Sequence, residues 1–215
     1  MDRDIAERSA ESAASIDESE ALRACYGHPS EMAVRKCLPK LDKHCRNFIA
    51  LSPFLCLGTA DARGTDVSPR GDAPGFVQVL DDDLILIPDR PGNNRLDSLG
   101  NILNRPEVGM LFMIPGVDET LRVNGTARIT TDADLLRRAA VNGKAPKSAL
   151  LVTVREAYLH CGKALIRSRL WQDDYRIERR RLPTLGQMIK DQVPIGASVE
   201  EADARINDGY KNRLY

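Results

Sequence analysis

Residues 68–75 display three polar side chains from a segment with a restricted backbone. Two prolines and two glycines favour a rigid, tightly turned loop between strands. Ser68, Arg70 and Asp72 contribute a hydroxyl, a guanidinium and a carboxylate, and an anion or a polar ring system needs fixed groups of this kind. An ordinary polar loop has the same composition, so the segment by itself leaves both interpretations open.

Residues 88–98 form a second candidate, where a predicted strand ends and a helix is predicted to start near Asn94. The backbone N–H groups at a helix N-terminus are free and carry partial positive charge, which suits a phosphate. Arg95 and Ser98 lie three positions apart in the expected first turn, so they would share one helix face. Arg95 would add charge-assisted bonds to phosphate oxygens. The alternative is that Asn94 only caps the helix and that Arg95 is solvated.

Two further segments carry polar side chains that could contact a ligand. Thr120, Arg122 and Asn124 alternate along a predicted strand and would therefore point the same way, although a solvated face explains the pattern equally well. Residues 160–171 combine cationic side chains with the chain's one tryptophan, Trp171. A lone tryptophan usually packs in a core, so this segment too has both a functional and a structural interpretation.

Adjacent histidine and cysteine residues occur twice, as His44-Cys45 and His160-Cys161. Neighbouring His and Cys seldom reach one metal, and no CxxC or HxxxH spacing supports a zinc site. A general base is placed by geometry rather than by sequence adjacency, so neither cysteine is identified as a nucleophile. We therefore predict no metal site and assign no catalytic residue. The sequence also lacks the glycine signatures of Rossmann, P-loop and α/β-hydrolase proteins.

Short apolar or alternating runs predict the strands that must position these segments. They cover residues 54–60, 76–80, 84–87, 108–114, 121–129 and 149–155. The aspartates at 81–83 predict a hairpin turn. Helical patterns cover residues 21–51, 94–104 and 132–142, with Thr131 as the N-cap of the last, and the final thirty residues are expected to be an irregular polar tail. About six strands with few long helices favour a β-rich α+β fold, a β-barrel decorated with helices.

Composition argues against several classes of protein. Lys plus Arg and Asp plus Glu both number 31, whereas a nucleic-acid binder usually has a basic excess. No stretch approaches the roughly 20 apolar residues of a membrane span, and the acidic N-terminus lacks the apolar core of a secretory signal. The five cysteines, odd in number, indicate reduced thiols. We therefore predict a cytoplasmic protein that binds neither nucleic acid nor membrane.

The order of these segments resembles that of the pyridoxamine 5′-phosphate oxidase-like, FMN-binding split-barrel proteins. The resemblance covers residues 35–175 and rests on the runs FLCLGTAD, SPRGD, NR, LFMIPG, TLRVNG and HCGKALIRSRLW. It implies a six-stranded antiparallel split β-barrel with flanking helices, forming a homodimer with FMN at the subunit interface. Outside the resemblance, polar composition predicts that residues 1–34 form a polar helical extension, with disorder of residues 1–20 as the alternative, and that residues 176–215 form a polar tail packed on the barrel or dimer.

The resemblance also implies roles for the polar residues singled out above. Ser68, Arg70 and Asp72 would line the FMN site. Arg95 and Ser98 would hold the FMN phosphate, at the helix start marked by Asn94. This implication agrees with the chemistry expected of a cation and a helix N-terminus.

Other positions would contact the rest of the flavin. Ile87 and Pro88 would offer backbone contacts near the ribityl chain or the ring, and Thr120 or Arg122 would approach the isoalloxazine. Three residues of the late segment would lie near the flavin of the partner subunit: Lys163, Ser168 and Trp171.

Two departures from the family pattern argue against oxidation of pyridoxamine 5′-phosphate itself. Residues 71–76 contain no lysine that would hold the substrate phosphate, and the C-terminal arginine/histidine substrate motif is not recognisable. The resulting hypothesis is an FMN-dependent oxidoreductase acting on an unknown small molecule, in which the flavin supplies the redox chemistry. The alternatives are a non-enzymatic flavin-binding module, either sensor or carrier, and a split barrel that binds haem or a deazaflavin, because fold alone does not decide function.

Overall fold

The computed structural model describes residues 15–194 and 196–215, and the chain divides into two units, Met1–Lys36 and Cys37–Tyr215. The described part of the first unit contains the helices α2 (Ser19–Tyr26) and α3 (Glu31–Arg35), and every residue described in it is exposed. These short helices bury nothing within their own unit. The predicted polar helical extension falls partly on residues 1–14, which lie outside the described residues.

The single helix predicted over residues 21–51 is wrong, because the chain breaks it into three. The last of these pieces is α4 (Lys43–Leu51), whose start is fixed by the Asp42 carboxylate accepting the N–H groups of His44 and Cys45 at 3.0 and 2.8 Å. Pro39 keeps the residue before it out of the helical region, and Leu38 instead forms a β-bridge with Ala157. Most of the predicted apolar stripe is nevertheless buried: Leu41, Cys45, Phe48 and Ile49.

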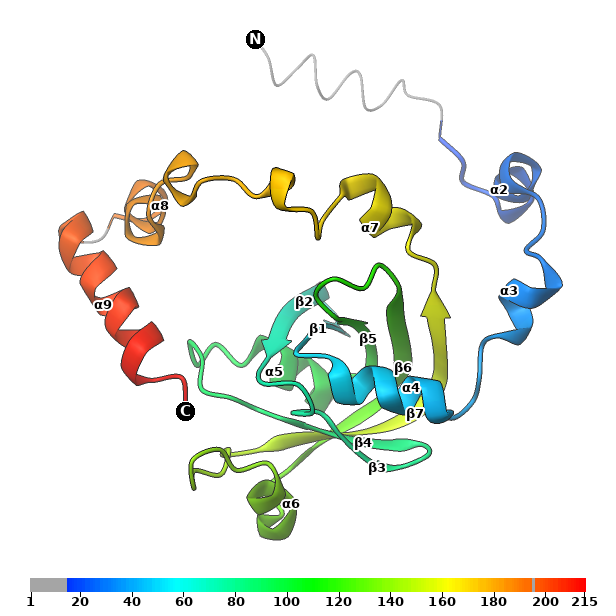
Figure 1. The fold of residues 1–215 in the computed structure, drawn as a ribbon, viewed down its shortest axis with the longest axis horizontal. Coiled ribbons are helices and arrows are strands. Elements are labelled where there is room, and N and C mark those ends of the chain that lie inside the picture. The colour runs from blue at the N-terminus through cyan, green and yellow to red at the C-terminus, as the bar shows by residue number, and fades with distance from the viewer. Residues whose placement is uncertain (1–14, 195) are drawn as a thin grey trace. The chain divides into compact units, whose positions relative to one another are not determined.

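The second unit is built on one antiparallel sheet of seven strands (Figure 1). The strands are β1 (Phe54–Asp61), β2 (Gly64–Gly71), β3 (Gln78–Asp81), β4 (Leu84–Pro88), β5 (Glu107–Met113), β6 (Thr120–Thr130) and β7 (Ala149–His160). Their order is β2-β1-β5-β6-β7-β4-β3, with β2 and β3 at the two edges. The β-rich α+β class is therefore confirmed, but the strand pairing forms an open seven-stranded sheet in place of the predicted six-stranded barrel.

The seventh strand is β2, in the segment that the sequence predicts to be a loop. It pairs along its whole length with β1, from Asp61↔Gly64 to Phe54↔Gly71. Pro69 is compatible with this position because an edge strand needs hydrogen bonds on one side only. Alternate residues of β2 point to opposite faces, so Asp66, Ser68 and Arg70 are half-buried whereas Val67 is exposed. The correction matters for the site because it fixes the direction of these polar side chains.

Strands from opposite halves of the sheet share one hydrophobic core. Leu55 of β1 and Ile85 of β4 belong to the same buried cluster, although β1 and β4 are four places apart in the strand order. The helix α5 (Asp97–Asn104) lies beside β1 and β2 in Figure 1, and its Asn101 side chain donates to the buried Thr59 hydroxyl at 3.0 Å. These contacts fix α5 against the inner face of β1.

The helix predicted over residues 132–142 is shorter in the structure. It is α6 (Ala133–Arg138), and its N-cap is Asp132 rather than Thr131, since the Asp132 carboxylate accepts the first free N–H groups. Leu136 of α6 packs in a second small cluster with Leu86 and Leu151 of the sheet. The chain leaves the helix at Ala139 and turns through Gly143, where φ is +76°.

Where an irregular tail is predicted, the structure has helices. After α7 (Lys163–Ser168) come the turns Asp173–Tyr175 and Arg179–Arg181, then α8 (Leu185–Gln192) and α9 (Val199–Asn212). Ser198 and Glu201 form a reciprocal capping box at the start of α9, and the Gly186 N–H of α8 donates to Asp203 of α9 at 2.9 Å. Among the residues described, no helix combines the length and apolarity that crossing a bilayer would require.

Candidate functional site

Four polar side chains of β2 and α5 form one chain of hydrogen bonds. The Arg70 Nε donates to the Ser68 Oγ at 3.3 Å, the Ser68 and Ser98 hydroxyls lie 3.0 Å apart, and the Ser98 Oγ donates to Asp66 at 3.3 Å. Ser98 is buried. We call Asp66, Ser68, Arg70 and Ser98 the β2–α5 cluster. The structure thus brings together three residues of the predicted site that lie up to 30 positions apart in the sequence.

Two ion pairs of opposite orientation join the end of β2 to the segment after β4. Arg70 Nη1 lies 2.6 Å from Asp89 Oδ1, and Arg90 Nε lies 2.6 Å from Asp72 Oδ2. The arginine is on the β2 side in the first pair and on the β4 side in the second. We call these four residues the double ion pair. β2 and β4 are not neighbours in the sheet. Their ends are therefore connected by these side chains and not by backbone pairing.

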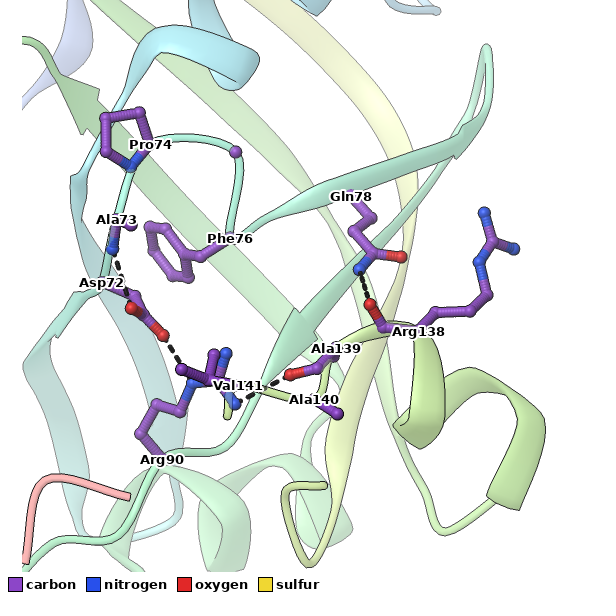
Figure 2. Close-up of a pocket in the computed structure, with 11 residues that line it drawn as sticks. Asp72, Ala73, Pro74, Phe76, Gln78, Arg90, Arg138, Ala139, Ala140 and Val141 are labelled. Atoms are coloured by element: carbon purple, nitrogen blue, oxygen red, sulfur yellow. Dashed lines mark hydrogen bonds and ion pairs between the residues drawn. The ribbon is translucent and has the colours of Figure 1, made fainter. Parts of the chain in front are cut away.

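The second of these pairs is the more deeply buried. The Asp72 side chain is 3% exposed and that of Arg90 16%, and Arg90 also donates to the Ala139 carbonyl at 2.9 Å (Figure 2). Burial by itself would raise the pKa of Asp72, but hydrogen bonds from Tyr215, from the Ala73 N–H and from Arg90 hold that pKa below its usual value. Asp72 is therefore a carboxylate with a full set of partners.

The segment that carries Arg95 differs from the prediction. Asn94 and Leu96 adopt left-handed backbone conformations, with φ of +58° and +62°, and α5 begins only at Asp97 with no side-chain cap. Arg95 therefore lies outside the helix, its side chain is 73% exposed, and its Nε lies 2.7 Å from Asp97. Ser98 points inward to the β2–α5 cluster. The prediction that a helix starts near Asn94, with Arg95 and Ser98 on one helical face, is wrong; of the alternative, the Asn94 cap is not formed but the solvated Arg95 is observed.

The remaining predicted residues lie on other elements. Ile87 and Pro88 are buried in β4, opposite Leu150 and Ala149 of β7. Thr120 is buried at the start of β6. The others have partners elsewhere in the second unit or are exposed: Arg122 donates to the Tyr158 hydroxyl, Trp171 Nε1 donates to the Val117 carbonyl, and Lys163 and Ser168 are exposed on α7.

The predicted site residues did not include three charged residues that the structure places in the site. Asp66, Asp89 and Arg90 belong to segments that the sequence marks as chemically interesting, yet their types alone gave them no role. The usable signal was the complementary order of charges, Arg70-x-Asp72 in one segment and Asp89-Arg90 in the other. Recognising it as a pair of contacts required knowing that the two segments meet.

The pockets on the described part of the second unit include two with polar linings. One of about 180 Å³ lies beside the Asp72–Arg90 pair and is lined by residues 72–76, Gln78, Arg90 and residues 138–141 (Figure 2). The other, of about 220 Å³, is lined by Asp118, Leu165, Ile166, Arg169 and Gln172. Pockets that enclose a drug-sized ligand measure about 300–1,000 Å³, so neither would enclose a whole flavin within a single chain.

Comparison with known proteins decides the family. A family model described as pyridoxamine 5′-phosphate oxidase matches residues 41–161, more than half of the chain. This chain belongs to the pyridoxamine 5′-phosphate oxidase family. The match runs from just before α4 to just after β7, so the family's region contains all seven strands of the described sheet and the whole double ion pair.

Solved structures resemble this family member only distantly. A histidine-to-alanine variant of HupZ from Group A Streptococcus is 18% identical, over 56% of this chain and 99% of that chain, with a TM-score of 0.45. A putative pyridoxamine 5′-phosphate oxidase of Lactobacillus delbrueckii is 21% identical, over 56% and 95%, with a TM-score of 0.44. An FMN-binding protein of Syntrophomonas wolfei is 10% identical, over 66% and 96%, with a TM-score of 0.40. No curated protein matches the sequence.

Proposed function

We propose that this member of the pyridoxamine 5′-phosphate oxidase family binds FMN and is an FMN-dependent oxidoreductase acting on a small molecule. The observation that carries the proposal is the segment before α5, which presents an exposed arginine next to an uncapped helix start. Free N–H groups and a guanidinium are the donors that a phosphate needs. Ser98 lies in the first turn of α5, and its hydroxyl is 3.0 Å from that of Ser68 and donates to Asp66. Together these groups fit a flavin phosphate.

The charges of the site allow Arg95 to change partner. Its ion pair with Asp97 has both side chains largely exposed, at 73% and 44%, and such surface pairs contribute only about 0–1 kcal/mol. Breaking this ion pair therefore costs little, which leaves Arg95 available to a phosphate. Arg70 differs, because its pair with Asp89 is only 18% and 21% exposed. We assign Arg95 to phosphate binding and Arg70 to holding the β2–α5 cluster in place.

When bound, FMN would supply the hydride or electron transfer, and the protein's part is to bind and orient it. Ile87, Pro88 and Thr120 are buried within the chain, so near the ring they would contribute backbone groups rather than exposed side chains. We also propose that Lys163, Ser168 and Trp171 contact the flavin that is bound to a second copy. No residue is assigned as an acid or base.

We further propose that FMN lies at the interface of a homodimer. The outer face of β1 and β5 carries half-buried apolar side chains, with Phe54 opposite Met113 and Cys56 opposite Leu111. A second copy covering this face would remove it from water and would complete a flavin site larger than either of the two pockets described above.

Arg95→Ala tests the phosphate assignment. Losing a hydrogen-bonded charge costs about 1.5–3 kcal/mol, so the FMN dissociation constant of the apoprotein should rise about 10- to 150-fold. The measurement is a fluorescence titration of flavin into apoprotein. Arg137→Ala is the matched control, because Arg137 is also an exposed arginine paired with an aspartate, but it lies on α6. An Arg95→Ala protein that binds FMN as tightly as the Arg137→Ala protein would contradict the assignment.

A further inference from the structure

Tyr215, which follows α9, makes three different contacts with the region of the double ion pair. Its hydroxyl donates to Asp72 Oδ1 at 2.7 Å. The Arg90 guanidinium carbon lies 5.5 Å from the centre of its ring, within cation–π range. Its backbone carbonyl accepts from Lys144 Nζ at 3.4 Å. One side chain thus touches both partners of the more buried ion pair.

The hydroxyl of Tyr215 completes the hydrogen bonds of Asp72. Asp72 Oδ2 accepts from Arg90, and Oδ1 accepts from the Ala73 N–H at 2.7 Å and from Tyr215. Because the Asp72 side chain is 3% exposed, water cannot easily replace a lost donor. The orientation of Asp72, and with it the position of Arg90, therefore depends on Tyr215.

Arg90 directly precedes the exposed segment that carries Arg95. Residues 91–97 are all exposed, and nothing lies within 4 Å of a Cβ placed at Gly92. Packing therefore does little to fix the shape of this segment. Its ends are fixed instead, by the double ion pair at Asp89 and Arg90 and by Ser98 in the β2–α5 cluster.

We propose that Tyr215 is a positioning residue for flavin phosphate binding: it fixes Asp72, and through Asp72 and Arg90 it holds the segment that presents Arg95. This inference rests on the proposed function. Tyr215 would act on the phosphate end of the ligand only, because its effect reaches the site through Arg95. Affinity for riboflavin, which has no phosphate, should not depend on it.

The experiment compares FMN and riboflavin titrations of apoprotein carrying Tyr215→Phe, which removes the hydroxyl and keeps the ring over Arg90. We expect the FMN dissociation constant to rise about 2- to 10-fold, the effect of one hydrogen bond, and the riboflavin constant to stay unchanged. Tyr210→Phe is the matched control, because Tyr210 is an exposed tyrosine of α9 five residues earlier. Its two constants should equal those of the wild type.

Three outcomes would overturn the proposal, and they differ from one another. Equal weakening of FMN and riboflavin binding would show a general structural role for Tyr215. An FMN constant equal to that of the Tyr210→Phe protein would show no role. A wild-type protein that binds neither flavin would refute the proposed function itself, and the positioning role with it.

Discussion

Arg90→Ala should lower the free energy of unfolding by about 3–5 kcal/mol, the cost of leaving one charge of a buried pair without its partner. The Asp72 carboxylate is 3% exposed and would keep only neutral donors, the Ala73 N–H and the Tyr215 hydroxyl. The Ala139 carbonyl would also lose its guanidinium donor. Urea unfolding followed by circular dichroism measures the loss.

Two companion variants separate this effect from a general loss of an arginine. Arg35→Ala removes an arginine whose ion pair with Glu31 is 78% and 80% exposed, and it should cost less than about 1 kcal/mol. Adding Asp72→Asn to Arg90→Ala should recover part of the stability, because the uncompensated charge disappears. Equal losses in Arg35→Ala and Arg90→Ala would mean that the double ion pair does not hold β2 to β4.

Phe112→Ala should also cost about 3–5 kcal/mol, because it empties a fully buried position in the centre of the sheet. Phe112 has no exposed surface, and its cross-strand partners Leu55 and Leu121 are equally buried. The residues around the cavity cannot fill it unless both partner strands, β1 and β6, move. The same urea titration measures the effect.

Leu111→Ala is the control on the other face of the same strand. Leu111 is half-buried on the face that the proposed homodimer would cover. In dilute protein its replacement should cost clearly less than that of Phe112, and the difference from wild type should grow with protein concentration if two copies pair there. If Leu111→Ala in dilute protein were as damaging as Phe112→Ala, the two faces of β5 would be assigned wrongly.

Buried strands could be predicted because a strand that is buried in the core is a short apolar run in the sequence. The apolar runs of β1, β4 and β5 match the observed strands to within one or two residues. β2 escaped because an edge strand needs neither a continuous apolar run nor a donor at every residue, so Pro69 and four polar or charged side chains looked like a loop. Its alternation of Asp66, Ser68 and Arg70 was the available signal.

Helix ends were predicted less well because they depend on single capping groups. The Asp42 cap and Pro39 divide what looked like one long helix, and left-handed residues delay α5 to Asp97. The start of α9 did carry a readable signal, since Ser198 and Glu201 have the spacing of a capping box. Helix α9 could therefore have been anticipated from the sequence.

The candidate site was predictable in its parts but not in its contacts. Segment order pointed to Ser68, Arg70 and Ser98, and the structure brings these together. The pairing of Arg70 with Asp89 and of Asp72 with Arg90 depends on how the sheet bends, which no local pattern records. The contact of Tyr215 with Asp72 spans 143 positions and follows from the path of the last helices.

The most direct test of the account is the visible absorption spectrum of the freshly purified protein, followed by mass spectrometry of the ligand that heating releases. We predict a flavin spectrum and the release of about one FMN per chain, as expected for a cofactor that carries the redox chemistry. A colourless protein that does not bind added FMN, or one with the Soret band of a haem, would contradict the account. In that case the exposed Arg95 and the start of α5 would be an ordinary surface loop.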